Sequence, residues 1–267
     1  MRAQRDAPRL HVLLARDKPV GVVIRRGPSK TFCTQLWDLR TNDFAMGQWI
    51  RARIYPMRSD LSPDGRYLVY FALNGRWQSE TRGSYTAISR APYLKAIALY
   101  PKGDAWGGGG LWTGPRTFWL NHRDGRETPL RSTGEVAPDP GVHRPGGLYE
   151  CPYVYYEQLQ RDGWNVVGDR DDGGVIGTFE KRAGAWTLRK TLFFDDGYRC
   201  RHALVHRESG TMHDCADWEW AEVRGPGLLY AARGCLHRAK VTLKNGIASR
   251  LVRDFNDMKF QAIAAPY

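Results

Sequence analysis

Two stretches near the beginning of the chain decide the fold: LWDLRT at residues 36–41 and SPDGRYLV at residues 62–69. In the second stretch, Asp64-Gly65 supplies the positive φ angle that a tight turn between two strands needs. The residues after this turn, RYLVYFA at 66–72, are rich in the aromatic and β-branched types that favour a strand. We therefore predict a hairpin at this turn, preceded by a strand that carries Trp37.

The same pattern of short strands and turns continues along the rest of the chain. Further strands are predicted at residues 20–25, 93–100, 117–120, 153–156 and 228–232, each bounded by Gly, Pro, Asp or Asn. Asp-Gly and Asn-Gly pairs recur between such runs, as at Asn74-Gly75 and Asp162-Gly163. No segment shows a 3.6-residue apolar stripe of helical length, and residues 155–161 are interpreted as a turn. The pattern predicts an all-β protein.

The pair LWDLRT and SPDGRYLV resembles the repeats of β-propellers of the WD-repeat and TolB-like kind. In those families the Trp-Asp dipeptide closes the third strand of one blade, and the SPDG turn joins the first two strands of the next. The resemblance implies four-stranded blades, with Trp37 buried between adjacent sheets. A degenerate echo begins at residues 217–223 and leads into a strand at 228–231. At about 40–45 residues per blade, the chain has room for five blades, with six as the alternative.

A propeller usually closes its ring by pairing strands from the two ends of the chain, and residues 10–14 and 260–264 are the predicted closing strands. Residues 130–147 hold three prolines and four glycines, the composition of a loop or a linker. Because the strand signals on either side are alike, we predict a single β-propeller domain over residues 1–267, with a long surface loop at 130–147.

The charge of the chain favours an acidic partner without naming one. The net charge is +12, and the basic residues are 31 Arg and 9 Lys. Such an arginine bias is also what GC-rich coding produces, so compositional drift is the alternative explanation. No block of five or more basic residues and no recognition helix is present, which disfavours nucleic acid as the partner. We expect a monomer that binds a protein partner and no membrane.

The five cysteines form no Cys-x-x-Cys pair and their number is odd, which is not the pattern of a disulfide framework. The apolar run at residues 10–15 is too short for a signal peptide, and no run approaches the length of a membrane span. The sequence therefore predicts a cytoplasmic protein with reduced thiols.

The candidate binding residues are aromatic and histidine side chains. Cys200, His202 and His206 would share one face of a strand, close to His213 and Cys215. Because same-face neighbours are about 7 Å apart along a strand, we predict hydrogen-bonded side chains rather than a metal site. Trp106 and Trp112 flank four consecutive glycines, and a ligand-facing platform of the two rings is a hypothesis. Trp220, in the degenerate echo, completes the set of Trp106, Trp112, His202, His206 and Trp220.

No motif assigns a reaction, so no catalytic residue, metal or cofactor is predicted. Neither the Gly-x-Ser-x-Gly motif nor a recognisable protease cysteine is present. Asp217, Glu219 and Glu222 lie close in sequence, but glycoside hydrolysis needs two carboxylates at a defined separation. We predict a non-enzymatic scaffold for protein–protein interaction with an acidic partner. The alternative is a ligand-binding or hydrolytic propeller that acts on a carbohydrate or a phosphate-bearing ligand in its central channel.

Overall fold

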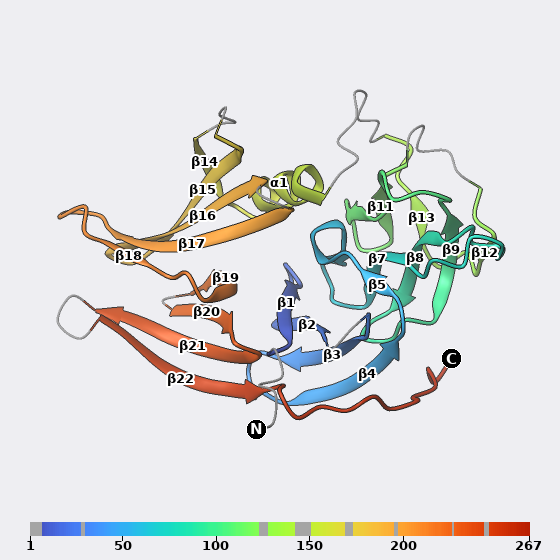
Figure 1. Cartoon of the computed structure of the whole chain (residues 1–267), viewed down its shortest axis with the longest axis horizontal. Coiled ribbons are helices and arrows are strands. Elements are labelled where there is room, and N and C mark those ends of the chain that lie inside the picture. The colour runs from blue at the N-terminus through green and yellow to red at the C-terminus, as the bar shows by residue number, and fades with distance from the viewer. Residues whose placement is uncertain are drawn as a thin grey trace, which may run out of the picture. The chain divides into compact units, whose positions relative to one another are not determined.

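The computed structural model describes residues 7–27, 30–122, 128–141, 151–168, 173–194, 197–225, 227–242 and 246–267. The chain divides into two compact units. The first unit holds residues 12–155 and 259–267, and the second holds the residues up to His11 together with 156–258. Most neighbouring strands in the sheets of each unit are antiparallel, whereas Thr117–Leu120 and Ala137–Pro138 form a parallel pair (Figure 1).

Three sheets build the first unit, and the first strand of sheet A begins in the second unit with residues 9–11. Sheet A contains β1 (Arg9–Leu14), β2 (Val20–Arg26), β3 (Phe32–Asp38) and β4 (Phe44–Ile50), in that order. Sheet B contains β5 (Arg53–Ile54), β6 (Asp60–Leu61), β7 (Tyr67–Leu73), β8 (Ser84–Arg90), β9 (Ala96–Pro101) and β12 (Arg131–Ser132). Sheet C contains β10 (Gly110–Trp112), β11 (Thr117–Leu120) and β13 (Ala137–Pro138). A single 3-10 turn, Pro56–Arg58, lies between β5 and β6.

Sheet B is buried on both faces. Successive side chains of a strand point to opposite sides, so one strand of this sheet can contribute to two cores. Leu68 and Tyr70 of β7 join a core with residues of sheet A, among them Val22 and Ile24. Val69, on the opposite side of the same strand, joins a second core that includes residues of sheet C, among them Trp112 and Phe118. Sheets A, B and C therefore pack face to face in chain order, as neighbouring blades do.

The Asp64-Gly65 turn lies where it was predicted, and Trp37 is buried as predicted. Trp37 lies near the end of β3 with no exposed surface and stacks on Phe44 of β4 in the same sheet, with ring centroids 5.8 Å apart. The Asp64-Gly65 turn joins β6 to β7 in sheet B, and Gly65 has a φ of 76°. The Ser62 hydroxyl accepts hydrogen bonds from the backbone N–H groups of Arg66 and Tyr67, which fixes the turn.

The chain contains a helix that was not predicted. Helix α1 runs over Cys151–Arg161. The strand predicted at residues 153–156 and the turn predicted at 155–161 were therefore both wrong. The buried residues of α1 are Cys151, Pro152, Val154, Tyr155, Gln158 and Leu159, which apart from Pro152 follow the spacing of a helical stripe. The stripe escaped detection because it is short and polar Gln158 interrupts it. The helix ends at Arg161 and is followed by Gly163, which has a φ of 83°, and the backbone N–H of Trp164 donates to the carbonyl of Leu159.

Other local expectations were also wrong. Residues 260–264 form no strand, so they cannot serve as a closing strand, whereas the predicted strand at 10–14 is β1. Asn74-Gly75 does not close a tight hairpin, because residues 74–83 form a longer connection between β7 and β8. The segment at 130–147 contributes the short strands β12 and β13, and its residues from 142 onwards lie outside the described ranges.

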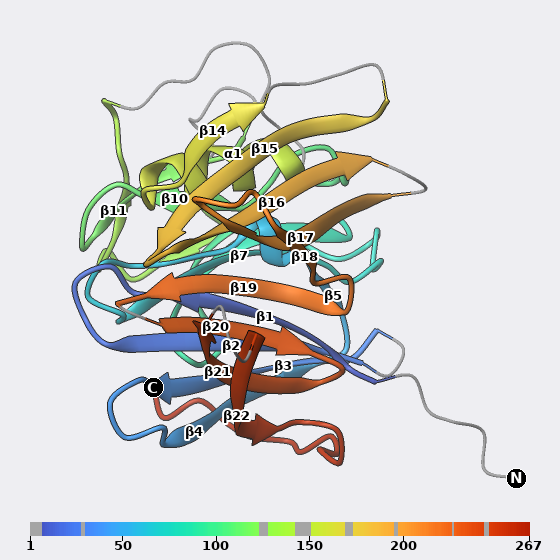
Figure 2. The same ribbon diagram turned by 90° about the vertical axis from the view of Figure 1, so that its left-hand side faces the viewer.

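The second unit contains two sheets. Sheet D has the order β14 (Asn165–Gly168), β15 (Val175–Ala183), β16 (Trp186–Phe194), β17 (Tyr198–His206) and β18 (Met212–Asp214). Sheet E has the order β19 (Trp218–Arg224), β20 (Gly227–Ala232), β21 (Cys235–Thr242) and β22 (Gly246–Asp254). Within this unit β19 lies beside β17 (Figure 2). Tyr156 of α1 packs edge-on against Phe179 of β15, at 4.6 Å between ring centroids.

The predicted fold class is confirmed: apart from α1 and one 3-10 turn, the elements of the described residues are strands, in five sheets of three to six strands each, as in a β-propeller with five blades. No helix among the described residues has the length and apolar character to cross a membrane. No disulfide joins the five cysteines.

Candidate functional site

The two histidines of the predicted set are buried on the same face of β17. His202 and His206 are 2% and 3% exposed, so neither ring is open to a ligand. The Nδ1 atom of His202 lies 3.1 Å from the carbonyl oxygen of Trp218 and therefore donates its proton to it. The Nδ1 atom of His206 accepts the backbone N–H of Ser209. Among the described residues, no group of three His, Cys, Asp or Glu side chains is arranged to hold a metal ion.

The three predicted tryptophans do not form a common surface. Trp106 is 70% exposed in the loop before β10, whereas Trp112 has no exposed surface and its Nε1 donates to the carbonyl of Asp60. One ring faces solvent and the other is part of the core, so Trp106 and Trp112 form no shared platform. Trp220 is 3% exposed on β19 and is likewise a core residue.

The four glycines between Trp106 and Leu111 have a structural role. They let the backbone wrap around Arg58, which is 3% exposed and donates from Nη1 to the carbonyls of Ala105 and Gly107. Gly109 has a φ of 80°, and a Cβ atom at this position would overlap the backbone carbonyl of Arg58. Only glycine allows this close approach.

A buried polar cluster lies within the second unit around Lys190 of β16. Lys190 is 1% exposed, its cross-strand partner on β17 is His202, and its Nζ lies 4.2 Å above the ring of Trp164. Burial lowers the pKa of Lys190, and the nearby Glu222 and Cys200 oppose that change. Burial and then the charge of Lys190 lower the pKa of His202 to about 3. The cluster is enclosed in the protein interior, so it is not a surface that a partner reaches.

The carboxylates that were considered for hydrolysis are engaged in the structure. Glu219 accepts the backbone N–H of Leu10 at 2.6 Å, and burial raises its pKa. Glu222 forms an ion pair with Lys181 at 3.0 Å and accepts the indole N–H of Trp164. Asp217 lies 3.5 Å from the guanidinium of the exposed Arg233.

A basic pocket lies on sheet E. Its volume is about 520 Å³. Ten residues from the four strands β19 to β22 line it: Arg224, Gly227, Leu228, Leu229, Arg238, Ala239, Lys240, Ala248, Ser249 and Arg250. Four of these side chains are cationic and none is acidic. A volume of this size is typical of sites for small organic groups.

The strand register explains how four cations from three strands reach one pocket. Arg238 of β21 lies directly opposite Arg250 of β22, and on its other side it faces Leu229 of β20. Because the side-chain period of a strand is two residues, Lys240 shares the face of Arg238. Arg224 of β19 lies opposite Gly227, and Lys240 lies opposite Ala248. Gly227 and Ala248 leave the space that the larger side chains surround.

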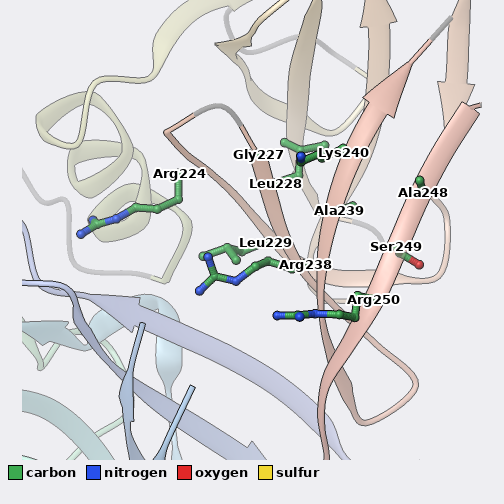
Figure 3. Close-up of a pocket in the computed structure, with 10 residues that line it drawn as sticks. All are labelled: Arg224, Gly227, Leu228, Leu229, Arg238, Ala239, Lys240, Ala248, Ser249 and Arg250. Atoms are coloured by element: carbon green, nitrogen blue, oxygen red, sulfur yellow. The ribbon is translucent and has the colours of Figure 1, made fainter. Parts of the chain in front are cut away.

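Four cationic residues lie close together in the pocket. Partial burial, followed by the charges of Arg250 and Arg224, lowers the pKa of Arg238. Among the described carboxylates, none forms an ion pair with Arg224, Lys240 or Arg250. Figure 3 shows the guanidinium groups of Arg238 and Arg250 extending in the same direction from neighbouring strands. The arrangement suits an anion that both guanidinium groups contact.

Sequence reasoning missed this pocket because its cations are not clustered along the chain. The available signal was the alternation in HRAK at residues 237–240 and ASR at 248–250, which places Arg238, Lys240 and Arg250 on one face if the hairpin has the observed register.

No family model matches the chain, and no curated protein matches it. Among solved structures, the GH43 BlXynB protein from Bacillus licheniformis is 11% identical with a TM-score of 0.37, over 98% of this chain and 60% of that one. This chain thus spans well under two thirds of that protein. The β-propeller domain of the Trilobed protease from Pyrococcus furiosus is 9% identical with a TM-score of 0.36, over 94% of this chain and 100% of that one. At such low TM-scores these similarities indicate nothing about the function of this chain.

Proposed function

We propose that the chain is a non-enzymatic binding module that recognises an acidic protein partner through the basic pocket of sheet E. The observation that carries this proposal is the convergence of Arg224, Arg238, Lys240 and Arg250, from three strands, on a hollow with no acidic lining residue. Arginine suits this role because its planar guanidinium contacts a carboxylate or a phosphate through two parallel hydrogen bonds.

The local cost of the arrangement supports a role in binding. Like charges directly opposite each other on neighbouring strands destabilise a sheet. Arg238 and Arg250 form such a pair, and Arg224 adds to the repulsion. A bound anion would reduce this repulsion.

The position of the other polar groups supports binding rather than hydrolysis. Glu222 is the acidic residue nearest the pocket in the register, opposite Leu229, and it is already paired with Lys181.

We further propose that the repeats are of the WD-repeat or TolB-like kind, and that the chain acts as a cytoplasmic monomer. These finer assignments stay predictions.

The test is a binding titration with a short peptide of Glu and Gly, labelled with a fluorophore and followed by anisotropy. The protein variants are Arg238→Gln/Arg250→Gln and the control Arg182→Gln/Arg207→Gln, which removes the same charge from exposed positions outside the pocket. We expect the pocket variant to bind about tenfold or more weakly than the wild type, because each charge-assisted contact contributes about 1.5–3 kcal/mol. The control should bind like the wild type.

Equal loss in both double variants would show that net charge alone attracts the peptide, and the proposal would then be wrong. Circular dichroism of each variant checks that the sheets are retained.

A further inference from the structure

The last residues of the sequence lie on the first unit in the manner of a bound peptide. Residues 259–267, called the tail below, form neither helix nor strand, and most of them are exposed (Figure 1). The tail belongs to the first unit, whereas residues 156–258 before it belong to the second. We infer that the tail is an exchangeable ligand, and that the surface beneath it binds a short linear protein segment with two aromatic side chains seven positions apart, the second of them a tyrosine.

The first anchor of the tail is Phe260. Its ring meets that of Trp49 at 5.9 Å between centroids, and the guanidinium of Arg51 lies 4.8 Å from the centre of the Phe260 ring. Phe260 is nonetheless 44% exposed. It is therefore held by aromatic and cation–π contacts at the surface rather than by burial in a core, and such contacts can be released while the core stays closed.

The second anchor is Tyr267, whose hydroxyl, ring and backbone are each contacted. The hydroxyl accepts the backbone N–H of Arg90 at 3.0 Å and donates to the backbone carbonyl of Lys95 at 2.8 Å. The guanidinium of Arg90 lies 4.7 Å from the centre of the ring, and Tyr93 meets the ring edge-on at 6.1 Å. Lys95 also donates from Nζ to the backbone carbonyl of Tyr267. A phenylalanine here would leave two backbone groups without their hydrogen bonds to the hydroxyl, so the surface favours tyrosine at this position.

Between the anchors, the side-chain amide of Gln48 on β4 contacts the backbone of the tail. Its Nε2 donates to the carbonyl of Ile263 at 2.8 Å. Its Oε1 accepts the backbone N–H groups of Leu94 and Lys95 at 2.8 and 2.9 Å, so the first unit itself orients the amide. A contact to the backbone does not depend on the side chain there, so the residues between the two anchors can vary.

All of these contacts come from one unit, so the surface is complete without any other part of the chain. Residues 48, 49 and 51 lie in and just after β4 of sheet A, and residues 90, 93 and 95 lie at the connection from β8 to β9 of sheet B. Because the tail pairs with no strand, its release breaks no strand ladder. Segments held by few contacts and no ladder are those that open most readily.

The experiment uses a fluorophore-labelled peptide with the sequence of residues 257–267, whose anisotropy is followed on titration with the full chain. In the wild type the attached tail competes at an effective concentration of about millimolar, so the peptide should bind weakly. Phe260→Ala/Tyr267→Ala weakens the attached tail and keeps the surface, and we expect it to bind the peptide at least about tenfold more tightly than the wild type. The control Lys259→Ala/Gln261→Ala changes exposed tail positions and keeps both anchors, and it should bind like the wild type.

A second peptide that carries Tyr267→Phe should bind the anchor variant about fivefold more weakly, because the backbone groups of Arg90 and Lys95 lose the hydroxyl. If the anchor variant keeps its circular dichroism spectrum but binds the first peptide no more tightly than the wild type does, the inference is overturned. Loss of the sheets in the anchor variant also overturns it, because the tail would then be part of the fold rather than a ligand. Equal affinity for the two peptides would overturn the preference for tyrosine.

Discussion

At the scale of single residues, the buried histidine His202 shows how position decides the role of a side chain. As one of three histidines between residues 202 and 213 it invited a binding role, but β17 directs it into the interior, where it donates to the carbonyl of Trp218. Burial, and then the charge of Lys190, hold its pKa at about 3. His202 therefore stays neutral in the folded state over most of the acidic range.

The depressed pKa makes stability depend on pH. Between about 6.5 and 3 the unfolded chain binds a proton at His202 that the folded chain does not, so the free energy of unfolding falls as the pH falls. From pH 6.5 to 5 we expect a loss of about 1.5–2 kcal/mol from this residue. His202→Gln should reduce the pH dependence, measured by urea denaturation across that range. An unchanged dependence in the variant would contradict the assigned cause.

The pocket residues illustrate the reverse case at the same scale. Arg238 and Arg250 look like two of 31 scattered arginines in the sequence. Only the register of β21 and β22 shows that they face each other. In the same way, the sequence could not distinguish buried Trp112 from exposed Trp106, because glycines with positive φ reverse the chain between them.

At the scale of elements, the hairpin of β21 and β22 carries a stability cost that can be measured. Arg250→Thr removes a cation opposite Arg238 and introduces a residue that favours strands, so we expect the free energy of unfolding to rise by about 0.5 kcal/mol. The control is Lys240→Thr, because Lys240 faces Ala248 rather than a cation and should give a smaller gain. Chemical denaturation of both variants provides the measurement.

A drop in stability for Arg250→Thr would mean that the arginine stabilises the sheet through its own contacts. The argument from local cost to binding would then fail. If Arg250 is a binding residue, we expect Arg250→Thr to gain stability and to lose affinity for the peptide.

The sequence predicted most elements because alternation and turn residues act locally. The runs at 20–25, 117–120 and 228–232 correspond closely to β2, β11 and β20, and the Asp64-Gly65 turn lies where it was placed. Helix α1 was missed because its stripe includes Gln158 and because the aromatic residues around it also favour strands. The strand expected at 260–264 is absent. This segment is instead held by side chains of the first unit: the side-chain amide of Gln48 donates a hydrogen bond to the backbone carbonyl of Ile263.

At the scale of the whole molecule, the net charge of +12 predicts how binding responds to salt. Exposed charges are screened within about 8–10 Å at physiological ionic strength. We therefore expect the affinity for an acidic peptide to fall steeply from low to physiological salt. Duplex DNA should compete weakly, because the sequence contains no block of five or more basic residues and no recognition helix. Competition titrations at several salt concentrations measure both effects.

A salt-insensitive complex would mean that the interface is apolar. The abundance of arginine would then reflect coding composition, and the basic pocket would have no part in recognition.

The measurement that tests the central claim most directly is a map of backbone amide shifts by nuclear magnetic resonance during titration with the acidic peptide. The pocket predicts that the largest shifts occur on β20, β21 and β22, at Gly227, Leu229, Arg238, Lys240 and Arg250. Sheets A, B and C of the first unit should change little. Saturable shifts confined to sheets A to C, with β20 to β22 unaffected, would contradict the assignment of sheet E as the binding surface.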